Sequence, residues 1–213
     1  MRMAAAFAVA CGAALLAAPA GAASPRGLLA GDSAKPRVAS DSRRLADWVV
    51  ATGDNQGLPF AVVDKKNARV LVFGADGRSR GSSPVLLGLA RGDDSVPGIG
   101  ERKIADIRPD ERTTPAGRFQ AEHGVNANGE DIFWIDYDAA VSMHRVRAHN
   151  KVERRLERLA SPSAADNRIS YGCINVPAAF YDRVIGSTFK RINPVVYVLP
   201  DVKQLGQVFT ALQ

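Results

Sequence analysis

Short apolar runs separated by turn residues dominate the chain after Leu58, and this pattern constrains the fold more than any other feature. Runs of about four to eight residues that are rich in Val, Ile and Phe and bounded by Gly, Pro or Asn are typical of strands. A doubly wound parallel sheet would need a helix between most of its strands. We therefore predict a mainly β fold, a mixed β-sandwich or partly open barrel with a few peripheral helices. The expected strands lie near residues 60–63, 69–73, 83–90, 117–123, 132–144 and 195–199, with the polar DKKN segment as a hairpin turn between the first two.

One helix is predicted before the first strand and another before the last strand. Residues 43–53 (RRLADWVVATG) form a short helix that ends near Gly53. Residues 177–187 (PAAFYDRVIGS) form another, with Pro177 near its first position and Gly186 near its end.

The first residues of the chain indicate export. Arg2 precedes an apolar run, and residues 20–22 (AGA) fit a small-x-small cleavage site, as in a secretory signal peptide. The alternatives are an uncleaved membrane anchor, which the break at Pro19 disfavours, and a lipoprotein processed at Cys11, which has too little apolar chain before it. We expect a periplasmic protein with no stable membrane span after processing. The predicted organisation is a signal peptide (1–22), a linker with the short helix (23–57), a compact domain (58–201) and a C-terminal tail (202–213).

The charge of the chain suits an anionic partner. The net charge is +6 and the sequence pI is about 9.6, as expected of a protein that meets a cell-wall polymer, a lipid surface or nucleic acid. Aromatic residues do not interleave with the basic ones, so we predict no nucleic-acid binding. Once Cys11 is removed with the signal peptide, one thiol and scattered histidines lack metal-ligand spacing, and no Gly-rich phosphate motif occurs. We therefore predict no metal and no cofactor, and we expect a monomer.

The cysteine at position 173 is the first candidate for catalysis. If residues 1–22 are removed, it has no cysteine partner within the chain, although exported proteins usually pair their thiols. It follows Gly172 and precedes the predicted helix, whose N-terminal partial charge would favour a thiolate. Backbone N–H groups of such a turn can also hold an oxyanion. The alternative is a buried, inert cysteine.

A cysteine nucleophile needs a base, and the sequence holds three histidines. His144 ends a strand-like run and would be held rigidly, so spacing favours it weakly. His123 lies at another strand end, and His149 lies in a polar stretch that we expect to be exposed. A structural histidine is the alternative for each.

Three motifs, in order, resemble the catalytic domain of the L,D-transpeptidase (YkuD) family. They are VVDKKNARVLVF (62–73), TTPAGRF (113–119) and an upstream histidine followed by SYGCIN (170–175), and together they cover roughly residues 58–200. Two residues depart from the family pattern. Tyr171 stands where the family usually has His, and Arg145 replaces the Gly that commonly follows the upstream histidine. The spacer between His144 and Ser170 is also longer than usual.

The resemblance implies a role for each residue of the motif. Cys173 would attack the carbonyl after the L-centre of the diamino acid in a peptidoglycan tetrapeptide stem, with His144 as acid and base. An amine acceptor would then give a 3→3 cross-link or exchange the terminal D-amino acid, and water would give L,D-carboxypeptidase activity. A catalytically lapsed wall-binding domain is the third possibility, whereas a papain-like protease has a different cysteine signature and order. The turn would be supported by Ser170, Tyr171, Gly172 and Asn175, and a substrate carboxylate would meet Arg145 or Arg168, for which a surface role is the alternative.

The long spacer contains a predicted helix at residues 151–160. Val152, Leu156 and Leu159 would form one apolar stripe, with basic residues on the opposite face. Either this is a solvated helix or it is a lid, with its stripe packed on the domain and its basic face toward the wall polymer. We predict the lid, and with it an effect on substrate choice more than on thiol reactivity.

Overall fold

The computed structural model describes residues 40–213, so the predicted signal peptide and most of the predicted linker lie outside the described residues. The strands are β1 (Phe60–Asp64), β2 (Arg69–Phe73), β3 (Ser79–Pro84), β4 (Leu87–Gly88), β5 (Gly117–Gln120), β6 (Glu122–Val125), β7 (Asp131–Asp136), β8 (Val141–Arg145), β9 (Arg168–Ser170), β10 (Ile174–Val176) and β11 (Val195–Val198). The helices are α1 (Asp41–Thr52), α2 (Arg155–Ala160), α3 (Ala178–Phe180), α4 (Gly186–Thr188) and α5 (Leu205–Val208), with short 3₁₀ turns η1 (Ile99–Glu101), η2 (Ile104–Asp106), η3 (Pro109–Glu111), η4 (Lys151–Glu153) and η6 (Thr210–Leu212). A π turn, η5 (Tyr181–Ile185), joins α3 to α4 in one helical segment.

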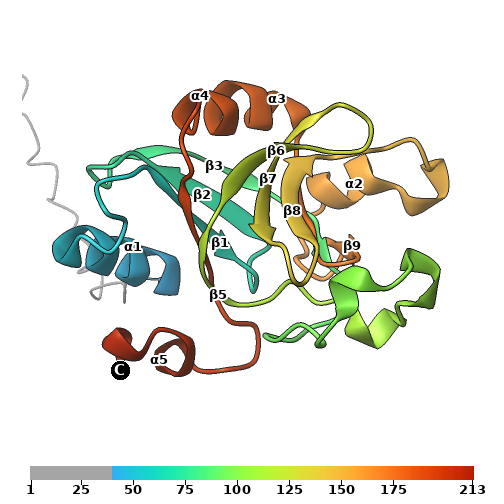
Figure 1. Cartoon of the computed structure of the whole chain (residues 1–213), viewed down its shortest axis with the longest axis horizontal. Coiled ribbons are helices and arrows are strands. Elements are labelled where there is room, and N and C mark those ends of the chain that lie inside the picture. The colour runs from blue at the N-terminus through green and yellow to red at the C-terminus, as the bar shows by residue number, and fades with distance from the viewer. Residues whose placement is uncertain (1–39) are drawn as a thin grey trace, which may run out of the picture. The chain divides into compact units, whose positions relative to one another are not determined.

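The strands form two main sheets and a small third one (Figure 1). Sheet A has the order β3-β2-β1-β11-β5, sheet B has the order β10-β8-β7-β6, and β4 pairs with β9. Two of the pairings in the main sheets, β1 with β11 and β10 with β8, are parallel and the rest are antiparallel. The prediction of a mainly β fold with mixed sheets is confirmed, and within residues 40–213 neither main sheet closes into a barrel.

The central strands of sheet A, β1 and β11, are buried on both faces, which explains their unbroken apolar runs. Ala61 and Val63 of β1 face the core that sheet A shares with sheet B. Phe60 and Val62 face the opposite way, into a second core. A strand covered on both sides reads as a continuous hydrophobic stretch because both alternating sets of side chains leave water.

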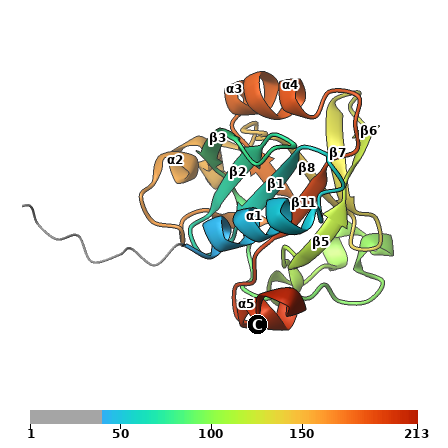
Figure 2. The same cartoon turned by 90° about the vertical axis from the view of Figure 1, so that its left-hand side faces the viewer.

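The second core is built by the two ends of the described chain. Leu45 and Val49 of α1 and Phe209 after α5 pack with the outer face of sheet A. Figure 2 shows α1 lying across the strands of this sheet. Burial of side chains such as Leu45 contributes about 1.5–3 kcal/mol each to folding. The segments predicted as a linker with a helix (23–57) and as a tail (202–213) therefore add α1 and α5 to the packed structure of residues 58–201.

Several strands differ from the prediction. The run expected at 83–90 is divided between β3, which starts in the polar segment at Ser79, and the short β4. The stretch at 132–144 forms the antiparallel hairpin of β7 and β8. The chain at 117–123 changes sheets at the buried Ala121, so that β5 belongs to sheet A and β6 to sheet B. Two strands of three residues, β9 and β10, were not predicted.

Within residues 40–213, no helix is both long and apolar enough to cross a membrane.

Candidate active site

Cys173 lies in a tight turn between β9 and β10, not at a helix terminus. β10 follows it immediately, and the helical segment begins only at Ala178. The prediction that a helix N-terminus activates this thiol is therefore wrong, because a strand separates the two. The parallel pairing of β10 with β8 places Asn175 opposite His144. The pairing of β8 with β10 thus brings the cysteine turn next to the strand that carries His144.

Two residues of β8, Ser142 and His144, act on the thiol of Cys173. The Ser142 hydroxyl lies 3.6 Å from the sulfur, and the backbone of Ser142 and the side chain of His144 affect the pKa of the thiol. Burial raises the pKa of the thiol, but the hydrogen bond and charge of His144 and the two Ser142 groups outweigh burial and bring the pKa below its ordinary value. A half-buried cysteine with a lowered pKa has the properties of a nucleophile.

The orientation of the His144 ring is set by its second hydrogen bond. Nδ1 lies 2.7 Å from the backbone oxygen of Arg145. A carbonyl oxygen can only accept, so Nδ1 carries the proton, and Nε2 is the nitrogen left to exchange a proton with Cys173. This tautomer is the one that a general base requires.

The turn that presents Cys173 is held by side chains of its own motif. The Ser170 hydroxyl donates to the carbonyl oxygen of Cys173 at 2.7 Å and accepts from the N–H of Gly172 at 3.1 Å. The side-chain amide of Asn175 donates to the same Cys173 oxygen at 3.1 Å. Ser170 and Asn175 thus lie where turn support was predicted. Because the N–H of Gly172 is used inside the turn, we assign Gly172 to the shape of the turn and not to an oxyanion site.

Gly172 is required by conformation and by space. Its φ of +135° lies where residues with side chains are strained. A Cβ at this position would lie 2.9 Å from the carbonyl oxygen of Thr113. Close to this contact, the Thr114 hydroxyl donates to the Gly172 oxygen at 2.7 Å and accepts from Gly88 at 2.9 Å. The TTPAGRF motif therefore lies directly against the cysteine turn.

Tyr171 borders the site as a stacked aromatic ring. Its side chain is partly exposed, and the Arg112 guanidinium lies 4.0 Å from the ring centroid. Arg112 is itself anchored by donation to the carbonyl oxygen of Ile107. Tyr171 therefore lines the pocket with its ring packed against Arg112.

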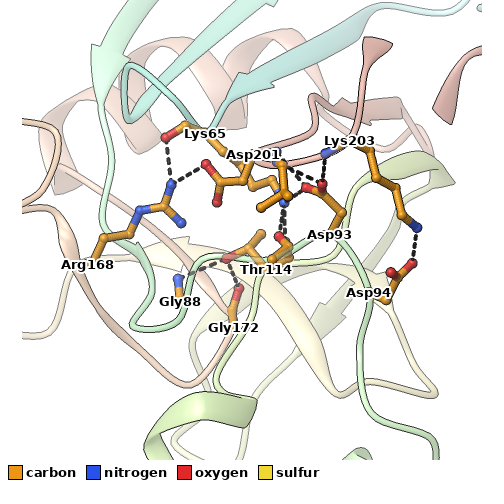
Figure 3. Close-up of polar contacts among 11 residues, drawn as sticks. Lys65, Gly88, Asp93, Asp94, Thr114, Arg168, Gly172, Asp201 and Lys203 are labelled. Atoms are coloured by element: carbon orange, nitrogen blue, oxygen red, sulfur yellow. Dashed lines mark hydrogen bonds and ion pairs between the residues drawn. The ribbon is translucent and has the colours of Figure 1, made fainter. Parts of the chain in front are cut away.

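Arg168 belongs to a buried ionic cluster and not to the surface. Its guanidinium donates to Asp201 and to the backbone oxygen of Lys65, both at 2.8 Å (Figure 3). Both side chains of the Arg168–Asp201 pair are almost fully buried. The prediction of substrate binding by Arg168 and its surface alternative are both wrong, because the side chain points into the protein.

The second ion pair of this cluster joins Lys65 to Asp93. The Lys65 ammonium is fully buried and donates to Asp93 at 2.9 Å, to Gly92 at 2.6 Å and to the backbone oxygen of Thr114 at 2.8 Å. Burial lowers the pKa of Lys65, and Asp93 opposes that effect. Figure 3 shows how Thr114 connects this pair to Gly172. Thr114 therefore hydrogen-bonds to both the ionic cluster and the cysteine turn.

A pocket of about 370 Å³ opens above the thiol. It contains Cys173 and His144 together with side chains from the turn, from the long spacer and from η2. Its lining residues are Ile104, His144, Arg147, His149, Asn150, Glu153, Arg155, Ser170, Tyr171, Cys173 and Asn175. His149 is exposed, as expected, and lies on the rim of this pocket.

Two other predicted residues lie away from this pocket. Arg145 forms ion pairs with Asp131 and Asp182 and stacks on Tyr181. His123 packs edge-on against a phenylalanine of β7 and lines a different pocket. The structure therefore brings His144, and not His123, to Cys173. Through Asp131 and Asp182, Arg145 joins β7 of sheet B to the helical segment that contains η5.

The segment at residues 151–160 of the long spacer, called the inserted segment below, borders the site, but its apolar stripe does not pack as expected. Arg154 has a positive φ of 50° and divides the segment into η4 and α2. Val152 is 88% exposed and Leu156 is 60% exposed, and only Leu159 is buried. The prediction that the whole stripe covers the domain is wrong, because the break at Arg154 takes Val152 out of the helix and Leu156 of α2 also faces solvent.

Ser142, Thr114 and Arg155 are among the residues of the site that were not predicted from the sequence. Ser142 had a usable signal, because it lies two residues before His144 on one strand and so faces the same way. Thr114 and Arg155 contact the turn through tertiary packing, which no local pattern reveals.

No protein-family model and no curated protein matches the chain. Among solved structures, it is similar to an L,D-transpeptidase from Xylanimonas cellulosilytica, with 16% identity over 66% of this chain and 60% of that one and a TM-score of 0.41. It is also similar to the helical cell shape determining protein Pgp2 from Campylobacter jejuni, with 15% identity over 74% of this chain and 56% of that one and a TM-score of 0.43. The chain thus spans 56–60% of the length of these two structures.

A third similar structure is the catalytic domain of an E. faecium L,D-transpeptidase, with 18% identity over 66% of this chain and 96% of that one and a TM-score of 0.36. Because these identities are only 15–18%, the chemistry of the present chain has to be argued from its own residues.

Proposed function

We propose that this protein is a peptidoglycan L,D-transpeptidase that uses Cys173 as its nucleophile and His144 as its acid and base. One observation carries the proposal, namely that His144 and Cys173 line the same pocket while the Ser142 hydroxyl lies 3.6 Å from the sulfur. The three motifs shared with the family supply the substrate class. Export to the periplasm, proposed from the first 22 residues, would deliver the enzyme to the wall.

The proposed reaction proceeds through an acyl-enzyme. The thiolate of Cys173 attacks the carbonyl carbon after the L-centre of the diamino acid, and a C–S bond forms. The peptide bond to the terminal D-alanine then breaks, and Nε2 of His144 gives the leaving amine its proton. An amine of a second stem attacks the thioester and loses a proton to His144, which restores the thiolate and completes a 3→3 cross-link.

Two alternatives differ from this proposal, one in the fate of the acyl-enzyme and the other in whether an acyl-enzyme forms. Water in place of the amine makes the same site an L,D-carboxypeptidase. A catalytically lapsed wall-binding domain is motivated by Tyr171 in place of histidine. The donors around the Cys173 sulfur favour an enzyme, because a site that only binds has no need to stabilise a thiolate.

Incubation of the purified protein with disaccharide tetrapeptides, followed by mass analysis, tests the proposal. Cross-linked dimers support transpeptidation, and stems shortened by one D-alanine support carboxypeptidation. Unchanged stem peptides together with binding to intact cell wall would support the alternative of a catalytically lapsed wall-binding domain. His144→Ala should slow turnover about 10²- to 10⁴-fold. His123→Ala is the matched control, since it removes the same side chain from sheet B outside the pocket, and an equal loss in both variants would contradict the assignment.

A further inference from the structure

The inserted segment makes a direct contact with the cysteine turn through one side chain. Arg155, the first residue of α2, donates from its guanidinium to the side-chain oxygen of Asn175 at 2.6 Å. A second guanidinium nitrogen pairs with Glu153. Only 15% of the Arg155 side chain is exposed, whereas the neighbouring Arg154 is 69% exposed and pairs with Glu157 at the surface. Arg155 is therefore the arginine of this pair that turns inward.

Asn175 contacts both Arg155 and the backbone of Cys173. It is 1% exposed, and its backbone pairs with Leu86 in both directions at 2.9 Å. Its amide nitrogen donates to the carbonyl oxygen of Cys173 at 3.1 Å. The backbone of Asn175 is thus fixed by its neighbours, and its side chain joins Arg155 to Cys173.

The chemistry of these groups permits a single orientation of the Asn175 amide. A guanidinium can only donate, and a carbonyl oxygen can only accept. The amide oxygen must therefore face Arg155, and the amide nitrogen must face Cys173. Without Arg155, the buried amide oxygen loses its charged donor, and the amide is free to turn away from the Cys173 carbonyl. That carbonyl belongs to the residue whose sulfur must stay near His144 and Ser142.

We propose that Arg155 is a positioning residue that holds Cys173 through Asn175, so that the inserted segment sets the reactivity of the thiol. The inference rests on the proposed role of Cys173 as the nucleophile. It reverses the expectation that this segment affects substrate choice more than thiol reactivity. Arg155 also lines the pocket, and its role as a substrate contact is the competing outcome of the test.

The test measures alkylation of Cys173 by iodoacetamide across pH in the full chain, which needs no peptidoglycan. Arg155→Gln should lower the alkylation rate by roughly tenfold, because a hydrogen bond from a charged donor to a buried group is lost. Arg154→Gln removes the same charge from the adjacent exposed position and should stay within about twofold of the wild type. Equal rates for the two variants at every pH, with a rise in KM alone for Arg155→Gln, would make Arg155 a substrate contact and overturn the proposal.

A double-mutant cycle with Asn175→Ala separates positioning from general loosening of the fold. If Arg155 acts through Asn175, Arg155→Gln should have no further effect on alkylation in the Asn175→Ala background. A loss that persists there would overturn the proposal. If Arg155→Gln does not fold, Arg155→Lys replaces it in the cycle. One ammonium cannot hold both Glu153 and Asn175 in the fork geometry, so a loss of about two- to threefold is expected, again only when Asn175 is present.

The two proposals fail in different ways. A wild-type thiol that alkylates rapidly but turns over no muropeptide would refute the peptidoglycan function and leave the positioning role of Arg155 intact. Normal turnover by Arg155→Gln with unchanged alkylation would refute the positioning role of Arg155 and leave the peptidoglycan function intact.

Discussion

Replacement of Lys65 by methionine should destabilise the protein strongly, although Lys65 does not line the pocket above Cys173. The ammonium is fully buried, and its three donors go to Asp93 and to the backbone oxygens of Gly92 and Thr114. Methionine fills nearly the same space and donates nothing. The substitution therefore leaves a buried carboxylate without its cation, and it removes the donor from the buried Thr114 carbonyl and the half-buried Gly92 carbonyl.

The loss of unfolding free energy in Lys65→Met depends on the hydrogen-bond donors that remain around Asp93. Removal of one partner from a buried ion pair costs about 3–5 kcal/mol. Asp93 keeps three backbone donors, from Asp201 at 2.5 Å, Val202 at 2.9 Å and Lys203 at 2.6 Å. We therefore expect the lower end of that range, about 3 kcal/mol of unfolding free energy. For a chain of this length, each kcal/mol lowers Tm by about 2–4 °C, which gives a fall of roughly 6–12 °C.

Urea and thermal unfolding, followed by circular dichroism, measure this change. Lys66→Met is the matched control, because it alters the next residue, whose side chain is exposed. The control should stay within about 0.5 kcal/mol of the wild type. A loss below about 1 kcal/mol for Lys65→Met, or a loss equal to that of the control, would refute the reasoning that the cluster in Figure 3 needs its cation.

Four further outcomes are expected. Cys173→Ala should keep the wild-type Tm and lose both turnover and the acyl-enzyme mass adduct, so a folded variant that still turns over would exclude it as the nucleophile. Ser142→Ala should lower alkylation of the thiol at pH 6 by about fivefold and move its pH profile upward, because a donor to the thiolate is lost; an unmoved profile would show that this hydroxyl is irrelevant. Gly172→Ala should cost about 1–3 kcal/mol in urea unfolding, because an alanine is strained at this φ, and a wild-type midpoint would contradict this. Burial raises the pKa of Asp93, but backbone N–H groups and its lysine partner bring the pKa to about 2. The stability that the ionised Asp93 contributes to the fold is complete above the unfolded pKa of about 4 and is lost as the pH falls from 4 through 2. The loss of unfolding free energy in this pH window should therefore be smaller in Asp93→Asn than in the wild type.

The strands that could be predicted are those whose side chains are buried on both faces or alternate clearly. β1, β2 and β11 carry such runs, and their positions agree with the prediction to within one residue. β3 was placed too late because its residues from Ser79 onward are polar, and it is held by pairing at the edge of sheet A. β9 and β10 have three residues each, too few for a periodic pattern, and they exist because β4 and β8 pair with them.

The candidate site shows the same division between local signal and tertiary packing. Cys173 and His144 were found because a motif joins them, and the parallel register of β8 and β10 brings them together. The burial of Arg168 could not be read from the sequence, since its partner Asp201 lies 33 residues further along the chain. The same holds for Arg155, whose charge alone indicates a solvated helix face.

The lowered pKa of the Cys173 thiol also sets how the protein responds to oxidants. A thiolate that attacks a carbonyl carbon reacts with peroxide as well, and the first product is a sulfenic acid. Within residues 40–213, Cys173 is the single thiol, so no neighbouring cysteine can trap that sulfenic acid as an intramolecular disulfide. Oxidation would then continue to the sulfinic acid, which is not reversed by ordinary thiols. The working lifetime of such a site in an oxidising compartment is set by how fast an outside reductant reaches the pocket.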